Sequence, residues 1–120
     1  MTNPYLHITV QRTDDVLCVS LKDHQLEDSA IRAMSDEIEA AVLRADSRKL
    51  VLSLGELTCL YSLLIAKLIK LRRLMSERHG SFKICNLSAE IRDVFESCQL
   101  QHYFDLAPDC DTAVKSLAAQ

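Results

Sequence analysis

The residues of this sequence that could do chemistry gather in one short segment, residues 53–66. It holds the hydroxyls of Thr58 and Ser62, the thiol of Cys59 and the phenol of Tyr61. A serine at the start of a helix can cap the helix through its hydroxyl, or it can accept a phosphate that the helix dipole stabilises. Capping is the commoner role. Thr58 is the weaker phosphate acceptor, because a loop threonine more often bonds nearby backbone groups.

Cys59 supports a hypothesis from another class, a small enzyme or ligand-binding protein. A thiol close to a helix N-terminus can be a reactive nucleophile. Cysteine is also a common small core residue, and an inert thiol is the commoner case. Thiol labelling separates the two, since an unreactive Cys59 removes the only chemical support for this hypothesis.

Other catalytic and ligand-binding patterns are absent from the sequence. It contains no G-x-G-x-x-G or Walker pattern, and two glycines cannot form a phosphate-binding loop as well as a helix end. The five cysteines are widely spaced and include no C-x-x-C pair, so they suggest neither a disulfide framework nor a zinc site. We therefore expect no metal, no cofactor and no catalytic residue.

The composition is typical of one globular domain covering residues 1–120. A hydrophobic content of 48% is enough for one continuous core. The balance of 14 basic against 17 acidic residues leaves a net charge of -3, which argues against nucleic acid as a partner. The uncharged run 57–66 is about half the length of a membrane-spanning helix. Without a leader-like N-terminus, the chain is expected to be cytoplasmic, with no membrane insertion.

Hydrophobic periodicity predicts a hairpin followed by alternating helices and strands. Period-two alternation or apolar runs predict strands, and apolar residues three and four apart predict helices. The expected strands are 5–11, 16–21, 50–54, 82–85 and 103–106. The expected helices are 29–45, capped by Asp28 or Ser29, one from 62 that stops at Gly80, one from 88, and a last one capped by Asp109 or Asp111. This order indicates an α/β fold with a mixed sheet of four to five strands and about four helices.

The run 50–54 is apolar almost throughout, which is typical of a central strand buried on both faces. Just after it, Leu60, Tyr61, Leu63 and Leu64 bring together more apolar side chains than one helix stripe can bury. We therefore expect at least one of these four to be exposed.

The same segment resembles a known family. The succession Leu54-Gly55, Leu57-Thr58 and a helix that stops at Gly80 is similar to STAS domains of the anti-sigma factor antagonist type. Their central strand ends in a pattern like L-G-x-L-T-F-x-D-S-S-G-L-G, before a helix that finishes in Gly-Gly. The resemblance covers nearly the whole chain, including Asn86-Leu87-Ser88, and it implies the STAS fold.

The sequence departs from this family pattern at the helix start. Tyr61 stands where the family has Asp, Ser62 is at the first hydroxyl position, and Leu63 replaces the usual phosphate acceptor. In the family a partner kinase phosphorylates that acceptor, and the added charge of about -1.5 to -2 weakens docking. Leu63 has no hydroxyl, so any phosphate in this segment is expected on Ser62.

The resemblance implies a non-catalytic module that binds an anti-sigma factor or related serine kinase and so releases a sigma factor. Apolar and aromatic side chains at the helix start would fill a pocket of the partner, and nearby lysines would supply charge at the rim. The residues expected to dock are Leu60, Tyr61, Ser62, Leu63, Lys67 and Lys70. For Leu60, core packing is an equally open alternative. The missing acceptor favours a second function, a constitutive scaffold or transporter-associated subunit, and a homodimer stays open.

Overall fold

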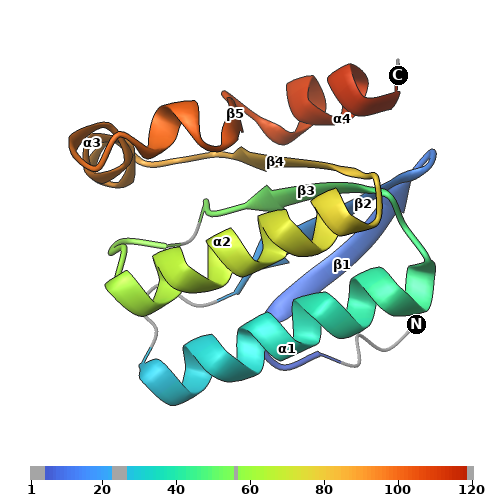
Figure 1. Ribbon diagram of the computed structural model, residues 1–120, viewed down its shortest axis with the longest axis horizontal. Coiled ribbons are helices and arrows are strands. Elements are labelled where there is room, and N and C mark those ends of the chain that lie inside the picture. The colour runs from blue at the N-terminus through green and yellow to red at the C-terminus, as the bar shows by residue number, and fades with distance from the viewer. Residues whose placement is uncertain (1–4, 23–26, 56, 119–120) are drawn as a thin grey trace.

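The computed structural model describes residues 5–22, 27–55 and 57–118, which form an α/β fold (Figure 1). A hairpin is followed by three alternations of helix and strand and by a final helix. The elements are β1 (Ile8–Thr13), β2 (Val16–Leu21), α1 (Asp28–Ala45), β3 (Lys49–Ser53), α2 (Ser62–Glu77), β4 (Ser81–Cys85), α3 (Ala89–Ser97), the short 3-10 helix η1 (Leu100–His102), β5 (Asp105–Ala107) and α4 (Cys110–Ala118). The predicted fold class is confirmed.

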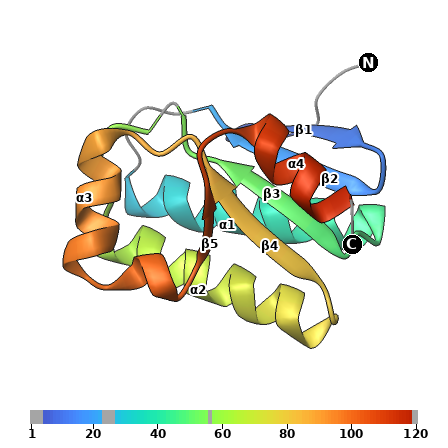
Figure 2. The same cartoon turned by 90° about the horizontal axis from the view of Figure 1, so that it is seen from above.

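The five strands form one mixed sheet in the order β1-β2-β3-β4-β5. β1 runs antiparallel to β2, and β2 to β5 run parallel to one another. α1 and α2 cover one face of the sheet and α4 covers the other (Figures 1 and 2). The crossovers through α1 and α2 therefore lie on the same side of the sheet.

β3 is the central strand and is buried on both faces, as its apolar run predicts. Leu50 and Leu52 face α1 and α2 and belong to the main hydrophobic cluster, whereas Val51 faces α4 and joins a smaller cluster. All three side chains are fully buried. A parallel strand covered by helices on both sides is expected to be apolar at successive positions.

β1 begins later than the alternation of the sequence predicts. Leu6 was expected inside a strand from residue 5, yet it lies outside β1 and is 79% exposed. The backbone N–H groups of Leu6 and His7 each donate to the carboxylate of Glu37 on α1, at 2.8 Å. The carbonyl of His7 still accepts from the N–H of Lys22 at 3.0 Å, so the pairing with β2 ends at His7, and the contact with Glu37 holds the backbone ahead of it against α1.

The last strand also differs from the prediction. Tyr103 and Phe104 were expected in it, but β5 begins at Asp105. Phe104 instead packs among aromatic rings, edge-on to Phe82 at 6.4 Å between centroids and tilted against Phe95 at 5.8 Å. Burial of this ring in the core decides the conformation before β5.

The helix ends confirm some expected caps and correct others. Asp109 caps α4, since its carboxylate accepts from the N–H of Thr112 at 2.7 Å. Ser88 caps α3 in the same way, accepting from Ile91 at 3.3 Å. At α1 the expectation was wrong, because the N-cap residue is Glu27 and Asp28 is already helical.

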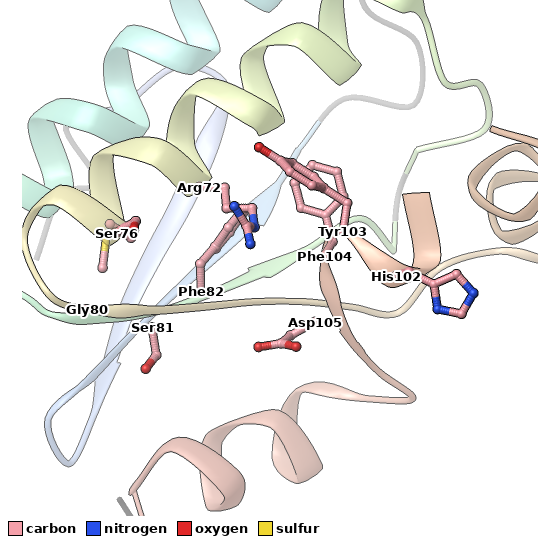
Figure 3. Close-up of a pocket in the computed structure, with 10 residues that line it drawn as sticks. Arg72, Ser76, Gly80, Ser81, Phe82, His102, Tyr103, Phe104 and Asp105 are labelled. Atoms are coloured by element: carbon pink, nitrogen blue, oxygen red, sulfur yellow. The ribbon is translucent and has the colours of Figure 1, made fainter. Parts of the chain in front are cut away.

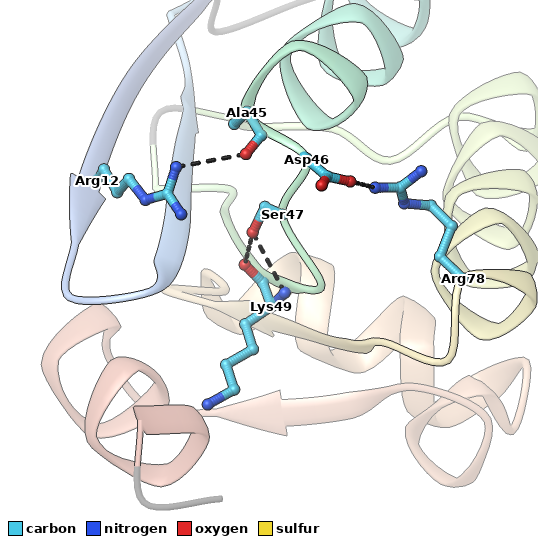
Figure 4. Close-up of polar contacts among 6 residues, drawn as sticks. All are labelled: Arg12, Ala45, Asp46, Ser47, Lys49 and Arg78. Atoms are coloured by element: carbon cyan, nitrogen blue, oxygen red, sulfur yellow. Dashed lines mark hydrogen bonds and ion pairs between the residues drawn. The ribbon is translucent and has the colours of Figure 1, made fainter.

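Polar contacts connect the elements at the edge of the sheet where the parallel strands begin (Figure 4). Asp46, which follows α1, pairs with Arg78 at the end of α2 at 2.8 Å. The buried hydroxyl of Ser47 donates to the carbonyl of Lys49 at 2.8 Å. Arg12 on β1 donates to the carbonyl of Ala45 at 3.4 Å. These contacts fix the turn between α1 and β3, at the opposite edge from segment 53–66.

Gly80 is required by a close contact and not by its backbone angles. His79, with φ of 58°, takes the left-handed conformation that ends α2, whereas neither glycine has a positive φ. A Cβ atom on Gly80 would lie 2.5 Å from the carbonyl oxygen of Arg48. The next residue, Ser81, donates its N–H to that same carbonyl at 2.7 Å, so the two backbones cannot separate without losing a hydrogen bond.

Replacing the two glycines by alanine therefore has different expected effects. Gly80→Ala should lower the free energy of unfolding by about 1–3 kcal/mol, the usual cost of forcing atoms into a packed site. Gly55→Ala is the matched control, since its Cβ would meet its nearest neighbours at 3.5 and 3.6 Å, which are ordinary contacts. It should change stability by less than about 1 kcal/mol. Urea denaturation measures both, and equal losses would contradict the assignment.

Candidate functional site

Segment 53–66 lies at the edge of the sheet where the parallel strands end. Figure 2 shows the connection after β3 beside the connection that leads from β4 to α3. Leu57 anchors the middle of the first connection, because its side chain is only 2% exposed and its N–H donates to the carbonyl of Leu54 at 2.9 Å. Glu56 lies outside the described residues. The buried side chain of Leu57 therefore anchors the connection between β3 and α2 to the core.

The docking residues predicted from the sequence fall into two groups. Leu60, Tyr61 and Leu63 are half-buried and pack against the main cluster, and Leu64 is fully buried. The expectation that at least one of these four side chains is exposed is wrong. The core continues past the end of β3 through Leu57 and Leu64, which gives the other three an apolar surface to rest on.

The aliphatic hydroxyl and thiol side chains within residues 58–62 are more exposed than the apolar and aromatic side chains between them. Thr58, Cys59 and Ser62 are all exposed. Exposed polar groups thus alternate with half-buried apolar side chains at the entrance to α2. A partner could contact both kinds of group at once.

Ser62 is the first residue of α2 and not its cap. The N-cap residue is Tyr61, with φ of -102° and ψ of 154°, and its side chain makes no capping hydrogen bond. The capping role that we considered the commoner one for Ser62 is therefore wrong. The first turn of α2 also contains no acidic residue. Negative charge at Ser62 would meet an uncompensated helix dipole.

Tyr61 and Cys59 interact with each other. A hydrogen bond with the Cys59 thiol is the main cause that raises the pKa of the Tyr61 phenol above its ordinary value, and desolvation acts in the same direction. The phenol is therefore neutral at physiological pH. The neighbouring thiol is that of a free, exposed cysteine.

The two lysines expected at the rim have different surroundings. Lys70 is paired with Glu39 of α1 at 3.3 Å, and about half of its side chain stays in solvent. Such a half-exposed pair contributes little to stability. Lys67 lies one turn closer to the loop and is half-buried. Lys67 is therefore the one of these two lysines that lies nearer to segment 53–66.

Sequence reasoning missed the contacts that hold the base of this segment. The amide of Asn86, which follows β4, donates to the hydroxyl of Ser53 at 2.9 Å and to the sulfur of Cys110 at 3.2 Å. The Ser53 hydroxyl also accepts from the N–H of Gly55 at 3.4 Å. Asn86 has a φ of 59°. Asparagine tolerates this left-handed conformation, so an Asn just after a predicted strand was the available signal.

A separate pocket lies at the other edge of the sheet, near the starts of β4 and β5 (Figure 3). It has a volume of about 270 Å³, and its lining includes Arg72, Ser76, Ser81, Tyr103 and Asp105. The guanidinium of Arg72 lies 4.1 Å from the centre of the Tyr103 ring, a cation–π contact. The segment 53–66 does not contribute to this pocket.

Among the described residues, no three His, Cys, Asp or Glu side chains are grouped so that they could hold a metal ion. The described helices also include none that is long and apolar enough to cross a membrane.

Comparison with protein families gives a match to the model described as STAS domain, over residues 7–113. The chain belongs to the STAS domain family. No curated protein is significantly similar to it in sequence.

Solved structures share the fold at low sequence identity. TM1081 of Thermotoga maritima superposes on this STAS domain with a TM-score of 0.85 at 14% identity, over 92% of this chain and 94% of TM1081. An anti-sigma-factor antagonist (STAS) domain protein of Planctomyces limnophilus gives 0.83 at 17% identity, over 92% and 97%. A chain from the stressosome, described as a signal integration and transduction hub, gives 0.76 at 16% identity, over 92% and 96%.

The role of Asn86 in this STAS domain can be divided into two parts by substitution. Asn86→Gly keeps the left-handed backbone accessible and removes the two side-chain hydrogen bonds, which should cost about 1–2 kcal/mol of unfolding free energy. Asn86→Ala removes the same bonds and adds about 1–2 kcal/mol for the left-handed conformation. Urea denaturation of both variants tests this order. If Asn86→Ala is as stable as Asn86→Gly, the backbone conformation contributes nothing.

Proposed function

We propose that this STAS domain is a non-catalytic module that binds an anti-sigma factor or a related serine kinase through segment 55–62 and the start of α2. Binding would occupy the partner and release a sigma factor for transcription. The module would act in the cytoplasm, where permanent structural disulfides are rare.

One observation carries this proposal, the mixed surface at the entrance to α2. Tyr61 and Leu63 are half-buried there, beside the exposed hydroxyl of Ser62. Their apolar surface is not fully used by the core and is held in place by packing, so a partner would bury it at little further entropic cost. Membership of the STAS family and the Planctomyces limnophilus relative support a regulatory protein as that partner.

Regulation would act through Ser62. A phosphate on this hydroxyl would add about -1.5 to -2 charges to the docking surface. The uncapped N-terminus of α2 would stabilise the phosphate, while burying that charge against the apolar part of the partner would cost desolvation energy and weaken binding. Leu63, at the usual acceptor position, cannot be modified.

A constitutive scaffold is the second candidate function. The absence of a hydroxyl at Leu63 and the similarity to a stressosome chain both favour it. A transporter-associated subunit is a variant of the same idea. In either case binding would be independent of phosphorylation, whereas the first function predicts that a phosphate weakens it. An adjacent gene for a serine-kinase anti-sigma factor or for a transporter ATPase would favour one or the other.

Leu63→Asp tests the docking surface. It should weaken binding to the cognate anti-sigma factor by about 2 kcal/mol or more, in the range of interface hot spots. The fold should persist, because an acidic residue in the first turn suits the helix dipole and offsets part of the lost packing. Calorimetry measures the affinity, and circular dichroism confirms that the variant is folded.

Leu43→Asp is the matched control for this experiment. Leu43 is a leucine in the last turn of α1, 55% exposed and at the opposite edge of the sheet. This variant should bind the partner like the wild type. Equal affinities of the wild type and folded Leu63→Asp would place the interface elsewhere.

Phosphate mapping tests the regulation. Incubation with the cognate serine kinase and ATP should place a phosphate on Ser62 and nowhere else in segment 53–66, because its exposed hydroxyl lies at an uncapped helix start. Ser62→Ala should abolish the incorporation. A phosphate mapped instead to Ser20 or Ser116, both of which are exposed, would refute Ser62 as the regulated position.

A further inference from the structure

Two cysteines far apart in the sequence lie side by side on the α4 face of the sheet. Cys85 is the last residue of β4 and Cys110 is the first residue of α4. Their sulfur atoms are 2.8 Å apart. A disulfide bond is about 2.05 Å long, so less than about 1 Å of movement would join them.

We propose that Cys85 and Cys110 are a modification site, a dithiol pair that peroxides convert into an intramolecular disulfide. This inference does not depend on the proposed docking function, because it rests on the contact between Cys85 and Cys110. It also adds to the sequence analysis, in which the cysteine spacing suggested no disulfide framework.

Access to the two sulfur atoms is unequal. Cys85 is completely buried. Cys110 is half-buried and lines a surface pocket of about 380 Å³ between α4 and the β1–β2 hairpin. The remaining lining includes Gln11, Thr13, Cys18, Asp111 and Lys115. A small oxidant can therefore reach Cys110 first.

The environment of Cys85 indicates that its sulfur reacts second, after the oxidant has reacted with Cys110. Burial is the main cause that raises the pKa of the Cys85 thiol far above its usual range, and the neighbouring Cys110 acts in the same direction. A thiol is a much poorer nucleophile than a thiolate, so Cys85 is protected from direct reaction with peroxide. It is nevertheless in contact with the sulfur that reacts first.

The chemistry balances with hydrogen peroxide as the oxidant. The Cys110 sulfur attacks one peroxide oxygen, the O–O bond breaks, and the products are a sulfenic acid and one water molecule. The Cys85 sulfur, already 2.8 Å from the Cys110 sulfur, then attacks it while the Cys85 proton passes to the departing hydroxyl, so no free thiolate has to form first. The S–OH bond breaks, and the hydroxyl leaves with this proton as a second water molecule. In sum two thiols lose two electrons and two protons, and one peroxide is reduced to two molecules of water.

Asn86 fixes the position of the Cys110 side chain relative to Cys85. Its amide donates to the Cys110 sulfur at 3.2 Å, and this residue directly follows Cys85 in the chain. The contact keeps the Cys110 side chain turned toward the end of β4. Intramolecular reaction should therefore be faster than reaction between molecules.

The disulfide would link α4 covalently to β4 of the sheet. The cluster under this helix is made mainly of small side chains, among them Ala107, Ala113 and Val51. A bond between residues 85 and 110 closes a long loop that includes α3 and β5, and closing such a loop restricts the unfolded chain. Oxidation should therefore raise the melting temperature by about 10 °C.

The test treats the reduced protein with a few equivalents of hydrogen peroxide and digests it with trypsin without reduction. Peptide 84–92 carries Cys85, but peptide 93–115 carries both Cys98 and Cys110. The experiment therefore uses the Cys98→Ser variant, in which only one assignment is possible. Mass spectrometry should find the two peptides joined, with a loss of two hydrogens, and thermal melting should show the rise.

Two variants complete the design. Cys110→Ser should form no bond at Cys85 and show no rise in melting temperature. Cys59→Ser changes an exposed cysteine that does not line the pocket at Cys110, and this variant should behave like the parent. Joined peptides that contain Cys18 or Cys59 in place of Cys85, or oxidation of Cys110 that stops at the sulfinic acid, would overturn the proposal. A disulfide without a rise in melting temperature would overturn its effect on α4.

Discussion

The fold depends on the burial of β3 on both faces. Leu50 and Leu52 project to one side and Val51 to the other, so each face of the sheet needs a covering layer. α1 and α2 form one layer and α4 the other. Because β2 to β5 are parallel, every helix that follows one of these strands begins near the same edge of the sheet. That edge therefore collects helix starts and exposed polar groups, which is where the candidate docking surface lies.

Hydrophobic periodicity was sufficient to predict the strand that the core buries on both faces. It was insufficient at strand boundaries that are set by contacts with residues far away in the sequence. The run 50–54 predicted β3 to within one residue, since burial on both faces makes the successive positions 50–52 apolar. The start of β1 could not be predicted, because Glu37 on α1 binds the backbone ahead of it. The start of β5 depends on Phe104, which packs against Phe82 and Phe95.

The candidate site shows the same division. The sequence placed Ser62 at the start of α2, because an apolar stripe begins there. It could not show that Leu60 and Leu63 are half-buried, because the surface beneath them is created by Leu57 and by the core. Nor does spacing along the chain indicate that Cys85 meets Cys110, or that Asn86 meets Ser53. Strand pairing and the return of α4 create both contacts.

Asn86 joins the two regions that this structure singles out. An amide nitrogen has two hydrogens, so it can donate to the Ser53 hydroxyl and the Cys110 sulfur at the same time. A side chain with one donor could hold only one of these acceptors. Ser53 also binds the N–H of Gly55, at the start of the segment proposed to dock a partner. The base of that segment and the first residue of α4 are thus positioned by a single side chain, and movement of either changes the geometry available to the other.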